Sequence, residues 1–176
     1  MLLNDKQIKE LVKKKEMIVL FVDHKEEGKL SYGLDPYGYT LRLSNEFAYF
    51  ENNINHPLNP LSEDIHNTIK YIATNRYLLK PKEVVLGKSI EYIDMPKNVT
   101  GFAYTKSTYA RLGVFANITT IDAGWEGFLT IEIANLGKNP VYIIANRGIA
   151  QIHFIKGEEA NSKYNGKYQK LNGIKV

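Results

Sequence analysis

Short hydrophobic runs, separated by Gly, Pro and Asn, follow one another along most of this chain. The runs are rich in Val, Ile, Tyr, Phe and Thr, a composition typical of β-strands bounded by turns. They are Met17–Val22, Tyr39–Leu43, Phe47–Phe50, Arg76–Leu79, Glu83–Ile93, Thr100–Thr105, Phe128–Asn135 and Val141–Ala145. In a chain of 176 residues, this series predicts a mostly β barrel or sandwich with few helices.

Two stretches instead have apolar residues at helical spacing. The first is a short helix near the N-terminus that Asn4 or Asp5 can cap, since a short polar side chain accepts a hydrogen bond from the first turn. Its apolar stripe consists of Ile8, Leu11 and Val12. The second predicted helix is Ser62–Ala73, with Ile65, Ile69 and Ile72 on one face.

Length and composition indicate a single domain over residues 1–176, because no linker or change of composition divides the chain. The formal net charge is +4, but the lysines are scattered. A small phosphate-bearing molecule therefore fits this charge as well as a nucleic acid does. The chain has no cysteine, which excludes disulfides, a cysteine nucleophile and thiolate metal ligands.

The N-terminal segment is amphipathic, since Asp5, Lys6, Lys9 and Glu10 interrupt its apolar residues. We expect neither a signal peptide nor a membrane-spanning segment, and hence a cytoplasmic protein. The segment from Gly157 to Val176 is polar, and its composition alone predicts a frayed tail.

The densest chemistry lies in KSTYARLG, Lys106–Gly113. A lysine, two hydroxyls and an arginine share one turn that ends in glycine, a set of groups suited to a polyanion. Further on, Glu132 lies between Ile131 and Ile133 in an apolar run. A glutamate in a strand usually faces solvent, but a carboxyl held in apolar surroundings is a candidate general base.

The order and spacing of several segments resemble the dCTP deaminases, whose superfamily also contains the trimeric dUTPases. The similar segments cover nearly the whole chain. They are MLLNDKQIKELVKK, SYGLDPYGYTLRLSNEF, KSTYARLG, AQIHF and SKYNGKYQKLNG. The resemblance implies a distorted jelly-roll-like β-barrel of the dUTPase-like, or β-clip, type. It also implies assembly as a homotrimer, with residues 157–176 covering the bound nucleotide as a lid.

The activity implied by this resemblance is hydrolysis of a cyclic amidine C–N bond, converting dCTP to dUTP and ammonia. Glu132 would take a proton from water and pass protons to the base, which requires a raised pKa. Ser107 and Arg111 would position the water and stabilise developing charge. The resemblance also implies nucleotide contacts from other positions. These are Lys106, Thr108, Tyr109, Ala110, Asp122, Thr130, Ile131, Gln151, Tyr164 and Lys167.

No zinc site is expected, although other cytosine deaminases use zinc. His24, His56, His66 and His153 show no HxE or HExxH spacing, and cysteine ligands are missing. Mg²⁺ is expected to accompany the triphosphate, held mainly by phosphate oxygens and water. The expected ligands are dCTP, with dUTP and dTTP as further candidates. We expect no nucleic-acid or membrane partner.

Two alternatives stay open. The first is a bifunctional enzyme that continues from dUTP to dUMP, because Asp122 occupies the position where the triphosphatases of the superfamily have the residue that activates water. Trp125, by contrast, follows the deaminase pattern. The second is a non-catalytic nucleotide-binding protein on the same scaffold. It rests on a departure from the family pattern in the tail, where Leu171 replaces a glutamine that helps to hold the nucleotide. A second departure, Thr40 in place of an aspartate, concerns local structure.

Overall fold

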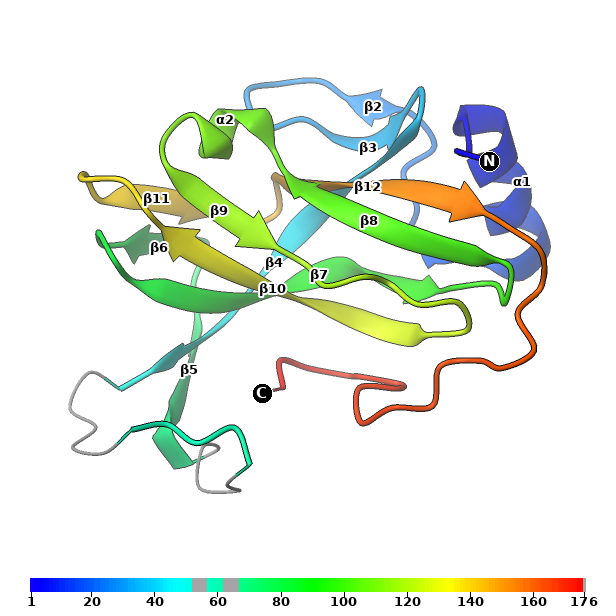
Figure 1. Ribbon diagram of the computed structural model, residues 1–176. Helices are drawn as coiled ribbons and strands as arrows, with labels where there is room; N and C mark the ends of the chain where they lie inside the picture. The colour runs from blue at the N-terminus through cyan, green and yellow to red at the C-terminus, as the bar shows by residue number, and fades with distance from the viewer. Residues whose placement is uncertain (52–56, 62–66, 176) are drawn as a thin grey trace.

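The computed structural model describes residues 1–51, 57–61 and 67–175, and these form a mostly β structure with two short helices (Figure 1). The elements are α1 (Asp5–Lys15), β1 (Ile18–Val19), β2 (Lys25–Glu26), β3 (Tyr32–Asp35), β4 (Gly38–Phe50), β5 (Ile69–Ala73), β6 (Arg76–Leu79), β7 (Val84–Asp94), β8 (Val99–Thr105), α2 (Ser107–Ala110), β9 (Val114–Asn117), β10 (Glu126–Asn135), β11 (Val141–Ile144) and β12 (Gly148–Lys156).

Ten of the strands form one antiparallel sheet that curls back on itself. Its main path runs β2-β3-β4-β7-β10-β9, while β12 joins β4 to β8, and β6 and β11 pair separately. In Figure 1, β8 and β12 lie above β7 and β10, and the long strand β4 crosses between the two layers. The predicted mostly β, barrel-like architecture is confirmed.

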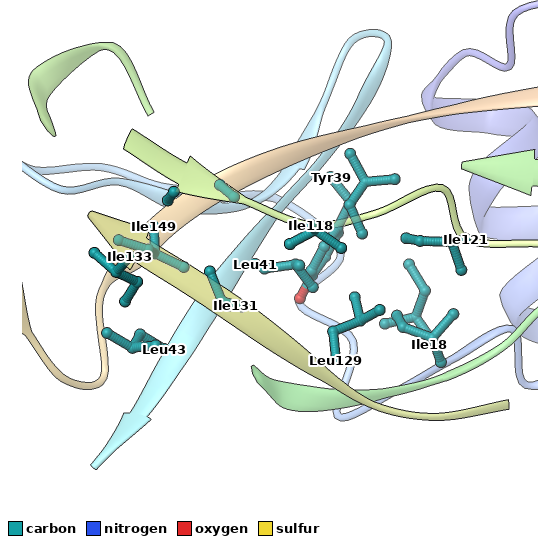
Figure 2. Packing of buried hydrophobic residues seen from close by; sticks show 14 of the residues in the cluster. Ile18, Tyr39, Leu41, Leu43, Ile118, Ile121, Leu129, Ile131, Ile133 and Ile149 are labelled. Carbon is teal, nitrogen blue, oxygen red and sulfur yellow. The ribbon is translucent and has the colours of Figure 1, made fainter. Parts of the chain in front are cut away.

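The core lies between these layers, and strand β10 shows why the sequence folds this way. Its residues alternate strictly between buried and half-buried positions, as expected when successive side chains point to opposite faces. Leu129, Ile131 and Ile133 face the core, where they join residues of β4 such as Leu41 and Leu43 (Figure 2). The other face of β10 is left for the polar residues of the candidate site.

The N-terminal helix α1 forms where it is predicted. Asn4 caps it in a capping box with Gln7, each side chain bonding the other's backbone N–H. Ile8 is fully buried on its apolar stripe. Within the described ranges, no helix has both the length and the apolar character needed to cross a membrane.

The predicted helix Ser62–Ala73 is wrong where the structure describes it. Residues 69–73 form strand β5, which pairs antiparallel with Glu46–Phe50 of β4, whereas residues 62–66 lie outside the described part. The edge of β4 supplies backbone hydrogen bonds to this segment, and its β-branched residues Ile69 and Ile72 fit a pleated surface. The expected strand Met17–Val22 is also shortened to Ile18–Val19, because Leu20 adopts a positive φ of 61°, which a strand cannot contain.

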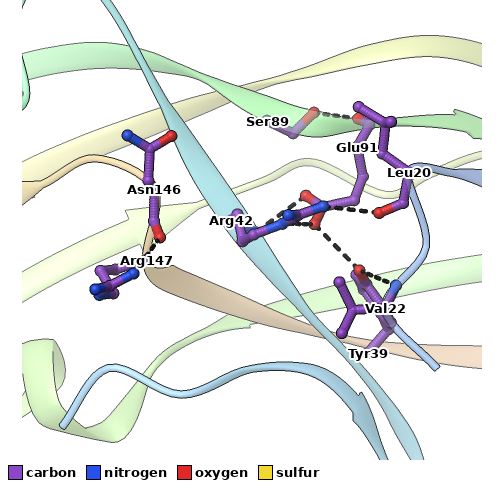
Figure 3. A network of polar contacts seen from close by, with 8 residues as sticks. All are labelled: Leu20, Val22, Tyr39, Arg42, Ser89, Glu91, Asn146 and Arg147. Carbon is purple, nitrogen blue, oxygen red and sulfur yellow. Dashed lines mark hydrogen bonds and ion pairs between the residues drawn. The ribbon is translucent and has the colours of Figure 1, made fainter. Parts of the chain in front are cut away.

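A buried ion pair fastens β4 to β7 inside the barrel (Figure 3). Glu91 is fully buried, and its Oε1 accepts hydrogen bonds from Arg42 Nε at 2.7 Å and from the Tyr39 hydroxyl at 3.1 Å. Arg42 also donates to the Leu20 carbonyl at 2.7 Å. Burial raises the pKa of the Glu91 carboxyl, and the Arg42 guanidinium only partly offsets this effect.

Candidate functional site

A pocket of about 320 Å³ opens on the polar face of β10, under the C-terminal tail. Its walls come from β10, from the 118–122 segment that follows β9, and from the tail. The lining residues are Phe50, Leu86, Ile118, Thr119, Thr120, Ile121, Asp122, Trp125, Leu129, Thr130, Glu132, Tyr164, Tyr168, Leu171 and Lys175. Apolar walls with a few polar groups are typical of a site for a small molecule.

Glu132 is the ionisable group at the centre of this site. It is half-buried and points into the pocket, away from the core-facing Ile131 and Ile133. Burial raises the pKa of its carboxyl, and a hydrogen bond from Asn117 acts in the opposite direction. That bond runs from Asn117 Nδ2 to Glu132 Oε2 over 2.9 Å. A carboxyl whose pKa is raised in this way is better suited to both accept and return protons than an ordinary surface glutamate.

Thr130 and Asp122 bring further polar groups to the same pocket. The Oγ1 atom of Thr130 is buried and has no hydrogen-bond partner among the described residues. A buried hydroxyl without a partner costs free energy, so a ligand that bonds it gains affinity. Asp122 lies in the turn before β10, where its carbonyl accepts a hydrogen bond from Trp125 N at 3.1 Å.

Trp125 and the tail form the cover of the pocket. The Trp125 indole is almost fully buried and donates a hydrogen bond to the Tyr168 carbonyl at 2.9 Å. Tyr164 and Leu171 line the pocket from the same tail. In Figure 1 this segment runs beneath β10 as an extended stretch. The tail is therefore held in place, contrary to the fraying that its composition alone predicts.

The KSTYARLG turn, which contains helix α2, lies away from this pocket in the folded chain. Helix α2 sits beside β9 and near β2 and β3, across the sheet from the tail in Figure 1. Lys106 Nζ donates to Ser31 Oγ at 2.9 Å, and Thr108 Oγ1 donates to the Lys29 carbonyl at 3.4 Å. Burial and then the nearby Lys25 ammonium lower the pKa of Lys106, so an anion bound there would relieve an unfavourable charge.

The remaining predicted residues divide between these two places or face the core. Ser107, Ala110 and Arg111 are exposed at α2, and Gln151 lies on β12 beside Tyr104 of β8. The Tyr109 side chain is buried, with its hydroxyl accepting a hydrogen bond from Ile144 N at 2.9 Å. Together with the buried Ile131, it can offer a ligand only its backbone.

One chain thus holds two separate groups of predicted residues. The pocket group is Asp122, Thr130, Glu132 and Tyr164, and the α2 group is Lys106, Ser107, Thr108, Arg111 and Gln151. No member of the α2 group lines the pocket. Lys167 belongs to neither group, since its ammonium lies 4.7 Å from the centre of the Tyr168 ring and does not line the pocket.

Sequence reasoning missed Asn117. Asn117 ends strand β9, a short strand that was not among the predicted ones, and the register pairs it with Glu132. Its position in the alternation of VFAN, with buried Val114 and Ala116, is the signal that it faces the pocket side. Among the described residues, no group of three or more His, Asp or Glu side chains could hold a metal ion.

Comparison with known proteins gives a consistent result. Residues 2–157 match the family model described as dCTP deaminase-like. The chain is 39% identical over 175 residues to the dCTP deaminase of Herpetosiphon aurantiacus, covering 97% of this chain and 95% of that one. It is 40% identical over 185 residues to the dCTP deaminase of Chlamydia pneumoniae, covering 98% of this chain and 96% of the relative.

A solved structure supports the fold. The crystal structure of 2′-deoxycytidine 5′-triphosphate deaminase from Agrobacterium tumefaciens superposes with a TM-score of 0.67 at 19% identity, over 89% of this chain. This chain spans about half, 48%, of the length of that protein. Since the family model covers most of the sequence and the curated relatives match it nearly end to end, the chain belongs to the dCTP deaminase-like family.

Proposed function

We propose that this protein hydrolyses the exocyclic C–N bond of dCTP, giving dUTP and ammonia. The observation that carries the proposal is Glu132, a half-buried carboxyl with a raised pKa facing a pocket of about 320 Å³. The relatives named dCTP deaminase, which match nearly the whole chain, supply the substrate class.

The proposed reaction uses Glu132 as both base and acid. Its carboxylate takes a proton from water, and the resulting hydroxide forms a bond to C4 of cytosine. The same carboxyl group gives this proton to N3, forming a tetrahedral intermediate with a hydroxyl on C4. It then takes the proton of that hydroxyl and passes it to the amino group, so that the C4–N bond breaks, the C4 carbonyl forms and ammonia leaves. Thr130 Oγ1, buried without a partner among the described residues, is available to bond the base. Proton transfer by a positioned carboxyl group such as Glu132 typically accelerates a reaction by about 10²- to 10⁴-fold.

The α2 group completes the proposed site from a neighbouring subunit of a homotrimer. Ser107 and Arg111 would position the water and stabilise charge at the base, whereas Lys106 and Gln151 would bind phosphates. The distance of α2 from the pocket within one chain supports a shared site, because a single copy offers only half of the expected groups. Symmetric assemblies commonly build sites between copies in this way.

The substrate is proposed to be the Mg²⁺ complex of the triphosphate. The metal would be held by phosphate oxygens and water, which suits the reluctance of Mg²⁺ to lose its hydration shell. Tyr164 would cover the nucleotide from the tail, and Lys167 would reach the phosphates after leaving the face of Tyr168. dUTP and dTTP are proposed as further ligands of the same pocket. The protein is proposed to act in the cytoplasm.

A second activity is favoured by Asp122, which lines the same pocket as Glu132. A carboxylate there could activate water against phosphorus and carry dUTP on to dUMP and pyrophosphate. The decisive experiment is incubation with Mg²⁺ and dCTP, followed by chromatography of the nucleotides and assays for ammonia and pyrophosphate. dUTP with ammonia supports deamination alone, while dUMP with pyrophosphate supports the bifunctional enzyme.

A matched variant separates catalysis from binding. Glu132→Gln keeps the size of the side chain but cannot move a proton, so turnover should fall by roughly three orders of magnitude while dCTP still binds. Wild-type protein that binds dCTP and releases neither ammonia nor pyrophosphate would instead indicate a non-catalytic nucleotide-binding protein.

A further inference from the structure

The C-terminal tail docks on the start of β10 through a series of backbone hydrogen bonds. Tyr164 N donates to the Ala123 carbonyl at 3.1 Å, Lys170 N to the Glu126 carbonyl at 2.8 Å, and Phe128 N to the Leu171 carbonyl at 2.8 Å. Gly127 and Leu171 form a parallel bridge. The tail is thus added to the sheet much as an extra strand would be.

The side chain of Gln169 adds two hydrogen bonds between the tail and the segment that leads into β10. Its Nε2 donates to the Gly124 carbonyl at 3.0 Å, and its Oε1 accepts from Glu126 N at 3.2 Å. One amide thereby bonds backbone groups on both sides of Trp125. Trp125 in turn donates its indole N–H to the carbonyl of Tyr168, the residue before Gln169.

We infer that Gln169 is a positioning residue that keeps the tail docked over the pocket. It acts through neighbouring tail residues that line the pocket, Tyr164 and Tyr168 before it and Leu171 after it. An undocked tail removes this wall, so only the docked fraction of molecules is competent to bind. The apparent affinity falls in proportion to that fraction. The effect on substrate rests on the proposed function, whereas the docking itself does not.

The chemistry of an amide is what this position requires. A donor must face the Gly124 carbonyl and an acceptor must face the Glu126 amide. Glutamate keeps the acceptor but turns an anion toward a carbonyl oxygen, and it adds a second carboxylate beside Glu126. Asparagine has the right groups, but it is shorter by one methylene and cannot span both partners.

Trp125 provides a readout that is independent of activity, because it is the single tryptophan of the chain and lies 7% exposed beneath the tail. Release of the tail brings water to the indole and moves its fluorescence to longer wavelength. The experiment compares Gln169→Ala and Gln169→Glu with Asn172→Ala, a control that removes an exposed amide from the same tail. A thermal melt of each variant confirms that the barrel is folded.

In the nucleotide-free protein we expect red-shifted emission for both Gln169 variants and an unchanged spectrum for the control. The KM for dCTP should rise about five- to fiftyfold, the range for losing two neutral hydrogen bonds, with little change in kcat. An unshifted spectrum in Gln169→Ala would overturn the docking role. A shifted spectrum with an unchanged KM would overturn the positioning role. Wild-type protein that does not turn over dCTP would refute the proposed function, and the spectra would still decide the docking.

Discussion

The side-chain amide of Asn117 donates a hydrogen bond to Oε2 of Glu132 over 2.9 Å, across a register pair of β9 and β10. It acts on a carboxyl whose pKa burial raises, and it opposes that rise by stabilising the ionised form. The proton affinity of the proposed base is therefore set by two adjacent strands, and it can be changed from Asn117 without altering Glu132.

Asn117→Ala should move the acidic limb of the pH–rate profile to higher pH. A general base must be ionised, so the rate falls as pH drops through its pKa. Without the amide, the pKa of Glu132 rises further above its ordinary value. The loss of a hydrogen bond to a charged group corresponds to a shift of about one to two pH units.

The measurement is kcat/KM for dCTP across the acidic range, with Asn117→Asp as the companion variant. A second carboxylate beside Glu132 disfavours its ionised form, so its acidic limb should move in the same direction. Variants that lower the rate equally at every pH would show that Asn117 is structural and does not tune the base.

The polar face of β10 could be predicted from sequence, whereas its surroundings could not. Alternation in FLTIEIAN correctly separates the core residues Ile131 and Ile133 from Glu132. Asn117 reaches Glu132 only because β9 pairs with β10 in one particular register. Pairing between strands depends on tertiary structure, and a four-residue strand carries too little pattern to reveal it.

Strand β5 and the buried Arg42–Glu91 pair could not be predicted from sequence, because both depend on contacts with distant segments. Ile69 and Ile72 fit helical spacing, but the free edge of β4 draws this segment into strand β5. Tertiary pairing overrides local periodicity there. Glu91 lies in the run Glu83–Ile93, where alternation predicts an apolar residue at each core position. Nothing near it in sequence indicates the partner, Arg42, which comes from a distant strand.

The separation of α2 from the pocket leads to a prediction about assembly. Mixing equal amounts of Glu132→Gln and Arg111→Ala subunits, under conditions that exchange subunits, should restore activity that neither variant has alone. If each site takes Glu132 from one copy and Arg111 from another, about one quarter of the sites in randomly mixed trimers carry both native residues.

The expected result is therefore about a quarter of wild-type activity, reached only after subunit exchange. Analytical ultracentrifugation of the same samples gives the oligomeric state. A monomer, or trimers that regain no activity on mixing, would contradict a site shared between copies.

Arg42→Met should destabilise the fold by about 3–5 kcal/mol near neutral pH, because it leaves the fully buried Glu91 carboxylate without its cation. The folded-state pKa of Glu91 is already raised by burial. Such a carboxyl contributes most to stability below its unfolded pKa, and this contribution is lost as pH rises through the folded pKa.

The decrease in the free energy of unfolding caused by Arg42→Met should consequently be smaller at about pH 5 than at about pH 8. Urea unfolding at both values measures it, with the double variant Arg42→Met, Glu91→Gln as control. Removing both charges should recover much of the lost stability. A loss of equal size at both pH values would mean that packing, and not the unpaired charge, is what Arg42 provides.

Leu171→Gln should strengthen the binding of dCTP and sharpen the preference for its base. Leu171 lines the pocket from the docked tail, and its carbonyl is fixed by Phe128 N at 2.8 Å, so a glutamine there starts from a held backbone. Its amide can bond a polar edge of the nucleotide that leucine cannot, and one such bond corresponds to a KM lower by about two- to tenfold.

The measurement is KM for dCTP, dUTP and dTTP in both proteins, with Leu171→Met as an apolar control that changes the shape but adds no hydrogen-bonding amide. Equal KM values for the glutamine and methionine variants would show that residue 171 contacts the nucleotide through packing alone.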